Sequence, residues 1–221
     1  PRCTLKMPGN NSSHRSVDAT CIILAGGQSR RMGENKAFVQ VANVAMFDRV
    51  FSTCRKMFSE VIVVTNSPEQ FKDYNAIVVT DLIEKAGPLG GLYTGLVYAR
   101  YAHAFCIACD MPLLNETLIR YLVGLSPGHD AVVPRRDGFF EPLHAVYSKR
   151  CIVPIAKCLR RGMRQICIFL KEIEVLCCDD DELRKVDPQL TSFTNINTRD
   201  DLRNLSEAWP VKVRFGRDSR R

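Results

Sequence analysis

Short apolar runs recur along the chain, and many of them end at a glycine or a polar residue. Each run has the length of a buried strand, roughly 4–8 residues, and most are rich in β-branched side chains. Runs that are apolar throughout, without polar alternation, are typical of strands buried on both faces of a parallel sheet. The predicted strands are 21–25, 61–65, 76–80, 104–109, 131–134, 142–147, 174–178 and 193–196.

Between these runs, apolar residues recur at every third or fourth position, which indicates helices with one buried face. The clearest case carries Phe47, Val50 and Cys54. Asn115 is suited to cap the helix that follows it, because its side chain can accept hydrogen bonds from the first turn. The segment GPLGG at 87–91 is expected to be a loop that leads into a helix. The predicted helical segments are 45–58, 68–72, 92–101, 115–125, 150–160, 164–171 and 198–207.

The alternation of strands and helices predicts an α/β fold, with a mostly parallel central sheet and helices on both faces. No repeat, low-complexity tract or clear linker interrupts the pattern, so one domain is expected over residues 19–208. Residues 1–18 are expected to be a disordered extension or a remnant of cloning, and residues 209–221 a basic tail.

The composition supports a folded chain, because 46% of its residues are hydrophobic and can form a substantial core. The formal net charge is +7, from 31 Lys and Arg against 24 Asp and Glu. Such a charge suits a nucleic acid and a polyphosphate substrate equally. Much of the excess lies near the two ends of the chain, which disfavours a nucleic-acid partner. An RNA-associated protein that binds through those basic ends stays open as an alternative.

Ten cysteines would suit a disulfide-rich secreted protein, but the opening residues carry no signal-like apolar segment and no stretch is long enough to cross a membrane. Most of the cysteines lie in apolar runs, where a reduced thiol acts as a small hydrophobe. A cytoplasmic location is therefore expected. Cys106 and Cys109 form a CxxC pair, but on a strand they point to opposite faces, so buried thiols are favoured over a zinc site.

The segment LAGGQSRRMGENKA at 24–37 places glycines, arginines and a lysine directly after a predicted strand. It lacks the GxGxxG spacing of dinucleotide-binding folds, and its lysine does not follow a glycine directly as a P-loop requires. Gly26 and Gly27 nevertheless allow backbone N–H groups to approach phosphates, and Arg31 and Lys36 can neutralise phosphate charge. A solvated basic turn is the alternative for this loop taken alone.

Ligands of open α/β sheets bind beyond the carboxyl ends of the strands. The glycine-rich loop, Asp81, the GPLGG segment and Asp110 each follow a predicted strand. We therefore expect them to converge on one crevice.

Four motifs occur in order: LAGGxSxRMGxxKA at 24–37, GPLxG at 87–91, CDMP at 109–112 and NxNT at 195–198. Together they resemble the molybdenum cofactor guanylyltransferase (MobA) family, over roughly residues 20–208. The resemblance implies a single-domain, Rossmann-like nucleotidyltransferase fold. It also implies transfer of GMP from GTP to the phosphate of molybdopterin, with Mg2+ as cofactor, release of pyrophosphate, and formation of the guanine dinucleotide form of the molybdenum cofactor. Transient contact with molybdoenzyme maturation proteins is a further implication.

The resemblance assigns catalytic and base-binding roles. Asp110 is implied to bind the metal, since a hard cation prefers carboxylate ligands. Lys36 and Arg31 are implied to meet the β and γ phosphates. Asp81 is implied to contact the guanine side of the nucleotide, where a carboxylate can accept hydrogen bonds from two N–H groups that adenine does not offer. Asn66 is implied to contact the base or the ribose. Strand-end capping is the alternative role for Asp81 and Asn66.

The other implied contacts concern the acceptor and the backbone around the nucleotide. Asn195 and Asn197 are implied to hold the metal or the acceptor phosphate, with capping of a final helix by this segment as the alternative. Arg164 is implied to hold the acceptor phosphate. The remaining predicted nucleotide-binding residues, all in the two glycine-rich segments, are Leu24, Ala25, Gly26, Gly27, Gly33, Gly87 and Gly90.

Three positions depart from the usual form of the family. Asn35 replaces an aspartate before the lysine, Gln165 replaces a second arginine, and Arg199 replaces a proline. Two alternatives stay open: a guanylyl- or cytidylyltransferase for another phosphorylated acceptor, and a nucleotide-binding module without turnover. The EPLH segment at 141–144 belongs to the half that the family uses for molybdopterin, but His144 itself is expected to be a hydrogen-bonded core residue.

Overall fold

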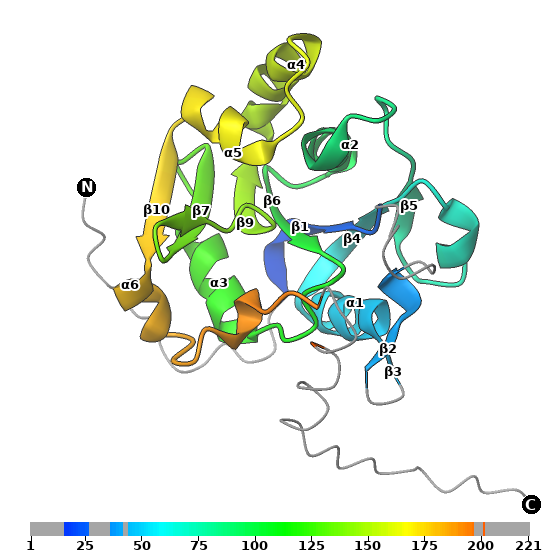
Figure 1. The fold of residues 1–221 in the computed structure, drawn as a ribbon, viewed down its shortest axis with the longest axis horizontal. Helices are drawn as coiled ribbons and strands as arrows, with labels where there is room; N and C mark the ends of the chain where they lie inside the picture. Colours follow the sequence, from blue (N-terminus) through cyan, green and yellow to red (C-terminus); the bar gives the residue numbers. More distant parts are fainter. Residues whose placement is uncertain (1–15, 27–35, 42–43, 197–200, 202–221) are drawn as a thin grey trace, which may run out of the picture.

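A computed structural model describes residues 16–26, 36–41, 44–196 and 201. These residues form a central sheet between two layers of helices, as the ribbon in Figure 1 shows. In the described part the sheet has eight strands in the order β10-β7-β9-β6-β1-β4-β5, with β8 paired to β7. The strands are β1 Val17–Leu24, β4 Phe58–Val64, β5 Ile77–Val79, β6 His103–Ala108, β7 Ala131–Arg136, β8 Phe139–Phe140, β9 His144–Ser148 and β10 Val175–Asp179.

The sheet is mostly parallel, as predicted. The parallel pairs are β1 with β4, β1 with β6, β4 with β5, and β7 with β10. Strand β9 runs antiparallel between β6 and β7. A separate small pair, β2 (Gln40–Val41) and β3 (Val44–Ala45), leads into the first long helix.

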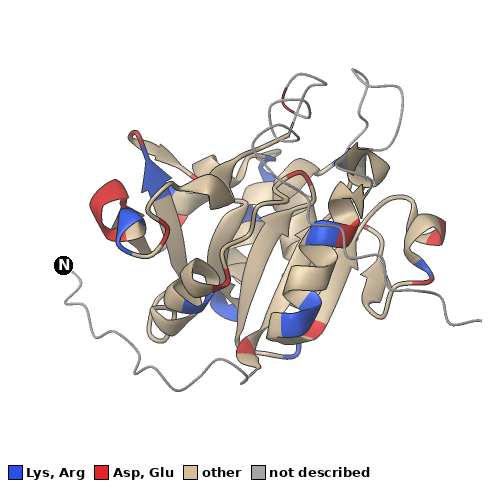
Figure 2. Cartoon of the chain, turned by 90° about the horizontal axis from the view of Figure 1, so that it is seen from below, with Lys and Arg blue, Asp and Glu red and all other residues tan. Residues whose placement is uncertain are grey.

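Both faces of the central strands are buried, which explains their unbroken apolar runs. On β1, Cys21 and Ile23 belong to one hydrophobic cluster, whereas Ile22 between them belongs to the other. On β6, Phe105 and Cys106 divide in the same way. Charged residues are confined largely to the ends of the strands and the outer surfaces of the helices (Figure 2).

Each face of the sheet is covered by its own helices, as predicted (Figure 1). The cluster that includes Ile23 is completed by α1 (Met46–Met57) and α3 (Glu116–Gly124). The opposite cluster is completed by α2 (Gly87–Tyr98), α4 (Ile152–Arg160) and α5 (Ile166–Phe169). The short α6 (Asp180–Arg184) follows β10. Asn115 caps α3 as predicted, accepting hydrogen bonds from the backbone N–H groups of Thr117 at 2.9 Å and Leu118 at 3.3 Å.

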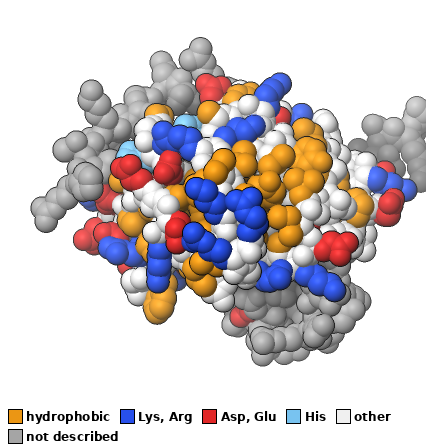
Figure 3. Space-filling model, turned by 90° about the horizontal axis from the view of Figure 1, so that it is seen from above, with side chains coloured by type: hydrophobic (Ala, Val, Ile, Leu, Met, Phe, Trp, Pro, Cys, Tyr) orange, Lys and Arg blue, Asp and Glu red, His pale blue; other side chains and the backbone are white. Residues whose placement is uncertain are grey.

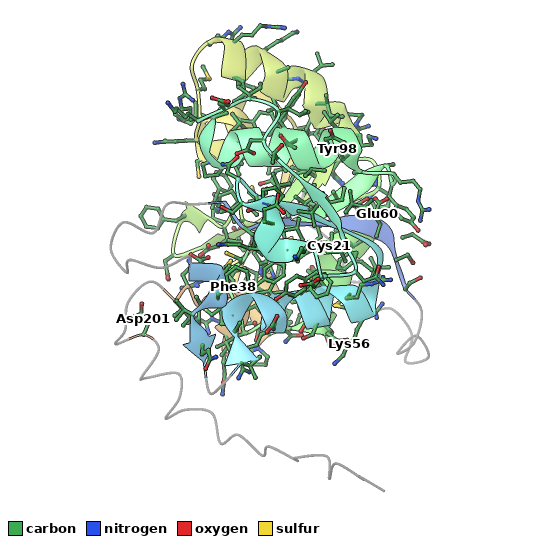
Figure 4. The ribbon with its side chains drawn as sticks, turned by 90° about the vertical axis from the view of Figure 1, so that its right-hand side faces the viewer. Cys21, Phe38, Lys56, Glu60, Tyr98 and Asp201 are labelled. Atoms are coloured by element: carbon green, nitrogen blue, oxygen red, sulfur yellow. The ribbon has the colours of Figure 1, made fainter. Side chains whose placement is uncertain are left out.

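Side chains in the interior and on the surface separate clearly in Figure 4. Cys21 lies inside the molecule, whereas Lys56 and Tyr98 lie on the outer sides of α1 and α2. None of the nine described cysteines forms a disulfide. Cys106 and Cys109 pack on opposite hydrophobic clusters, as predicted for residues three apart on a strand. No helix among the described residues is long and apolar enough to span a membrane.

The outer face of the α2 and α4 layer mixes basic and apolar side chains (Figure 3). Tyr98 is 47% exposed on α2 and Val153 is 61% exposed on α4. Lys157 and Arg160 are exposed on the same helix as Val153. Long basic side chains can cover apolar surface while their charges stay in water, so this mixture is compatible with a solvated face.

Two predictions of local structure are wrong, the strand at 193–196 and the loop at 87–91. Residues 193–196 do not form a strand: a short 3-10 turn, Thr191–Phe193, precedes an irregular segment. The chain turns at Leu190, whose φ is 52°, and the backbone N–H of Ile196 donates to the Asp110 carbonyl at 2.9 Å instead of joining a ladder of the sheet. The predicted helix at 198–207 falls almost entirely outside the described residues.

The GPLGG segment is the first turn of α2 and not a loop before it. Proline is compatible with this position because the first turn of a helix leaves its N–H groups without helical partners. Glycine is required further along, where α2 lies against β1: a Cβ on Gly91 would be 3.1 Å from Leu24 Cδ2, and one on Gly95 only 2.5 Å from Ile22 Cγ2.

Gly95→Ala is therefore expected to lower the free energy of unfolding by about 1–3 kcal/mol, because the added methyl overpacks the contact between α2 and β1. Chemical denaturation measures the change. Gly124→Ala at the end of α3 is the matched control, since a Cβ there meets no described atom within 4 Å, and its stability should stay the same or rise slightly. Equal losses in the two variants would contradict the packing role of Gly95.

Candidate active site

The carboxyl end of β1 lies between two polar groups. The backbone N–H of Ala25 donates to the Val64 carbonyl at 2.9 Å, and the N–H of Cys109 donates to the Leu24 carbonyl at 3.2 Å. These bonds fix the ends of three neighbouring strands side by side. Gly26, the next residue, is exposed at this edge.

The first polar group joins the ends of β4 and β5. Asn66 Nδ2 donates to Asp81 Oδ2 at 3.2 Å. A Cβ on Gly26 would lie 3.8 Å from Asn66 Nδ2, and one on Gly91 would lie 3.7 Å from Asp81 Oδ1. The glycine-rich end of β1, the Asn66–Asp81 pair and the first turns of α2 therefore lie close together.

Asp81 has unused hydrogen-bonding capacity. Its Oδ1 atom is buried and has no hydrogen-bond partner among the described residues. Burial raises the pKa of this carboxyl group, and the hydrogen bond from Asn66 opposes the rise. A buried acceptor without a partner is costly, so this oxygen is suited to accept a hydrogen bond from a ligand.

The second polar group lies at the end of β6. Asp110 and Asn195 line the same pocket of about 280 Å³. The hydrogen bond from Ile196 to the Asp110 carbonyl holds the two segments together. The helix that follows is capped by Asn115, so Asp110 is not needed for that purpose. The pocket is lined by Ala108, Asp110, Met111, Glu141, Pro142, Leu143 and Asn195.

The two groups lie at the same edge of the sheet, as predicted, but they are distinct. Asn66 and Asp81 do not line the pocket that contains Asp110. The end of β1, with Leu24 and Gly26, lies between them, because β1 pairs with β4 on one side and with β6 on the other. A ligand that contacts both groups must therefore pass the end of β1.

The donor atoms near Asp110 suit a hard divalent cation. A carboxylate and an amide oxygen are ligands of the kind that Mg2+ prefers, and Mg2+ usually takes only one or two carboxylates, with substrate phosphates and water filling its other positions. No group of three His, Cys, Asp or Glu side chains in the described part is arranged to hold a metal alone. The residues thus fit a metal shared with a phosphorylated substrate.

Arg164 contacts the start of α2. Its Nη1 donates to the Lys85 carbonyl, and its own carbonyl accepts a hydrogen bond from Leu89 at 3.3 Å. A Cβ on Gly87, whose φ is 64°, would lie 3.2 Å from that same carbonyl. Arg164 is therefore tied to the start of α2 and does not line the Asp110 pocket. Its contact with the acceptor phosphate stays a prediction.

Several predicted residues cannot be placed. Gly27, Arg31, Gly33 and Asn197 lie outside the described residues, and the side chain of Lys36 is also not described. The chain resumes in the 3-10 turn Lys36–Phe38. Figure 4 shows Phe38 and Asp201 toward the end of the molecule opposite Glu60, which lies near the start of β4. Phe38 and Asp201, which follow the undescribed residues 27–35 and 197–200, therefore lie toward the edge of the sheet that carries the site.

Gly90, predicted to approach the nucleotide, also packs closely against Ala86. A Cβ on Gly90 would lie 2.3 Å from the Cβ of Ala86. Gly90 itself is buried. Its predicted contact with the nucleotide is untested, whereas the need for glycine at this point of α2 follows from the packing.

One wall of the pocket comes from the EPLH segment, which the sequence analysis assigned to the acceptor half without giving Glu141 a role of its own. The wall is formed by Glu141, Pro142 and Leu143, and Arg136 lies 3.6 Å from Glu141. An acid directly before the predicted strand 142–147 was a signal for a polar residue at a strand end. Its pairing with Arg136 arises from the β7–β8 hairpin and could not be seen in the spacing.

His144 differs from the prediction of a hydrogen-bonded core residue. It is fully buried, and neither ring nitrogen has a hydrogen-bond partner among the described residues. The ring lies between Phe105 and Phe193, with centroid distances of 5.1 and 4.9 Å. Burial lowers the pKa of His144 to about 3, and the charge of Asp187 opposes this shift only partly. Its environment is that of a neutral packing residue behind the pocket.

Polar groups beyond the carboxyl ends of the strands of an open α/β sheet are typical of a ligand-binding site. The chain belongs to the MobA-like NTP transferase domain family, whose model matches residues 21–173. It is therefore a nucleotidyltransferase by family.

Curated relatives and solved structures agree with this family. A molybdenum cofactor guanylyltransferase of Desulfosudis oleivorans is 40% identical over 86% of this chain and 95% of the relative. A probable molybdenum cofactor guanylyltransferase of Pelotomaculum thermopropionicum is 39% identical over 84% and 91%. The crystal structure of molybdopterin-guanine dinucleotide biosynthesis protein A from Archaeoglobus fulgidus matches with a TM-score of 0.76 and 28% identity, covering 86% of this chain and 97% of that one.

His144 predicts a loss of stability in mild acid. The unfolded chain takes up a proton on histidine near pH 6.5, whereas the folded chain does so only near pH 3. Acidification from pH 7 to 5 therefore favours the unfolded state by about 2 kcal/mol through this residue. Denaturant unfolding at several pH values measures the slope. His144→Leu should remove this part of it, and an unchanged slope in the variant would contradict the assignment.

Proposed function

We propose that this chain transfers GMP from GTP to the phosphate of molybdopterin, with release of pyrophosphate and formation of the guanine dinucleotide form of the molybdenum cofactor. The observation that carries the proposal is the pair of polar groups on either side of the β1 end: Asn66–Asp81 and Asp110–Asn195. One group suits a base and the other suits a metal-bound phosphate. The names of the relatives supply the identity of the two substrates.

On the nucleotide side, Asp81 recognises guanine. The unpartnered Oδ1 and its neighbouring Oδ2 can accept hydrogen bonds from N1–H and the 2-amino group of the base. Asn66 holds the carboxylate through its 3.2 Å hydrogen bond. Adenine lacks the N1–H donor and cytosine offers only an amino group, so the same carboxylate favours GTP over ATP and CTP.

On the phosphate side, Asp110 and Asn195 would hold Mg2+, which supplies charge neutralisation at the α-phosphate and at the departing pyrophosphate. Gly26 and Gly27 let the backbone approach the phosphates, and Arg31 and Lys36 neutralise the β and γ groups. A phosphate oxygen of the acceptor attacks the α-phosphorus, and the bond to the β-phosphate oxygen breaks. The chain's residues position and neutralise these groups, and no covalent enzyme intermediate is required.

We place this reaction in a reducing compartment, the cytoplasm. The absence of a disulfide among the nine described cysteines supports that location.

Replacement of Asp110 tests the phosphate side. Asp110→Asn should lower the rate of pyrophosphate release from GTP and molybdopterin at least about 100-fold, because the carboxylate that would hold the metal is lost. Asp179→Asn is the matched control, since Asp179 also ends a strand but pairs with Arg135 at the surface. An Asp110→Asn variant with the wild-type rate, or a wild-type protein that binds GTP but never releases pyrophosphate, would contradict the proposal.

Replacement of Asp81 tests the base side. Asp81→Asn should weaken GTP binding roughly 10- to 100-fold and reduce the preference for GTP over ATP, because one acceptor becomes an amide donor. Wild-type affinity should fall on acidification as the carboxylate takes up a proton. The fall should begin at a higher pH than for an exposed aspartate, because burial raises the pKa of Asp81.

Calorimetric titration with GTP and ATP across a pH series measures both effects. Glu84→Gln, a change at a nearby exposed acid, should keep the wild-type affinity and pH dependence. Equal affinity of the Asp81→Asn and wild-type proteins for GTP would contradict the role of Asp81.

A further inference from the structure

The pocket beside Asp110 has a second wall that the transfer of the phosphate does not use. Glu141, Pro142 and Leu143 form this wall, and the residues that would hold the metal line the same pocket. The pocket, at about 280 Å³, is smaller than the roughly 300–1,000 Å³ typical for a whole drug-sized ligand. It suits one ring system of a larger substrate.

The Glu141 carboxylate is charged but only partly neutralised by its neighbour. Its side chain is 23% exposed, and Arg136 Nη1 lies 3.6 Å away, too far for a hydrogen bond. Burial raises the pKa of Glu141, and Arg136 opposes the rise. The carboxylate therefore keeps acceptor capacity for a ligand.

Arg136 is itself held in place by the segment that contains Phe193. Its guanidinium carbon lies 5.5 Å from the centroid of the Phe193 ring, and its Nη1 donates to the Phe193 carbonyl at 3.5 Å. The same segment carries Asn195 two residues later. The positive charge beside Glu141 is thus a fixed part of the site.

The turn that carries Glu141 is rigid. The backbone N–H of Glu141 donates to the Pro134 carbonyl at 2.9 Å, and the N–H of His144 donates to the Glu141 carbonyl at 3.2 Å. The hydroxyl of Tyr147, which is fully buried, donates to the Pro142 carbonyl at 2.7 Å. A backbone held in this way limits the entropy lost when the side chain of Glu141 binds a ligand.

The chemistry of this wall selects a donor-bearing ring. A carboxylate repels a phosphate, but it can accept two parallel hydrogen bonds from an N–H group and an adjacent amino group. The pyrimidine ring of a pterin presents such a pair, while Met111, Pro142 and Leu143 offer apolar contacts for its faces.

We propose that Glu141 is the residue that selects the acceptor, by accepting hydrogen bonds from the N–H and amino groups of its pterin ring. This inference rests on the proposed function, because that function supplies a pterin acceptor. Arg136 positions Glu141 and keeps its charge tolerable in the partly buried wall.

A shared metal site is the competing role for the two acids of the pocket. Asp110 and Glu141 both line it, but the guanidinium of Arg136 next to Glu141 disfavours a cation at that carboxylate. The described residues also contain no group of three metal-binding side chains. If Glu141 binds the pterin, a Glu141 variant changes the dependence of the rate on molybdopterin concentration. If Glu141 binds the metal, the variant changes the dependence on Mg2+ concentration.

The kinetic test uses Glu141→Gln in the full chain, with pyrophosphate release as the signal. The KM for molybdopterin should rise roughly 10- to 100-fold, while the dissociation constant for GTP and the Mg2+ requirement stay unchanged. Glu172→Gln is the matched control, because it removes another Arg–Glu pair, with Arg161 at 3.8 Å on the surface. An unchanged KM for molybdopterin, or a raised Mg2+ requirement, would overturn the proposal.

A binding test on the wild-type chain does not depend on turnover or on the folding of a variant. The test titrates two ligands in turn, with ligand fluorescence as the signal. The first is 6-hydroxymethylpterin, and the second is the corresponding lumazine, in which an oxygen replaces the 2-amino group of the pterin. We expect tighter binding of the pterin, and loss of that preference in Glu141→Gln. Equal binding of the two ligands to the wild type would overturn the role of Glu141, whereas a wild type that prefers the pterin but never transfers GMP would overturn only the proposed reaction.

Discussion

The register between β1 and its two parallel neighbours determines where every proposed group of the site lies. Leu24 is paired with Val64 on one side and with Ala108 on the other, so β4, β1 and β6 end at the same level. Because β1 is buried on both faces, its apolar pattern alone would tolerate a slip that exchanges the faces. The glycines of α2 oppose such a slip, because Gly95 packs on Ile22 and Gly91 on Leu24 at points where a Cβ would be crowded.

This register divides the site according to the chemistry of its ligands. Asn66 and Asp81 are carried by the strands on one side of β1, and Asp110 by the strand on the other. In the proposed reaction the base binds on the first side and the acceptor on the second, so the reacting α-phosphate must lie near the end of β1. The exposed backbone of Gly26 at this point leaves room for a phosphate to approach.

The sequence predicts the layers of this fold better than it predicts the site. Buried strands such as residues 61–65 were recognisable because both of their faces are apolar, and Asn115 because capping is a local interaction. Residues 193–196 were mistaken for a strand because Phe193 and Ile196 are apolar, although they pack on His144 and Met46 and not in the sheet. The pairing of Glu141 with Arg136 depends on a hairpin, and no local pattern reveals it.

The two acids of the Asp110 pocket show how one small space can serve an anionic reaction. A pocket that holds two carboxylates would repel phosphorylated substrates unless each charge had its own counterpart. Glu141 has a fixed guanidinium 3.6 Å away, whereas in the proposed reaction a divalent cation would balance the charge of Asp110. Because the two acids are balanced by different partners, a change in one need not disturb the other. In the proposed reaction, recognition of the acceptor and chemistry at the phosphate therefore depend on separate charges of the same pocket.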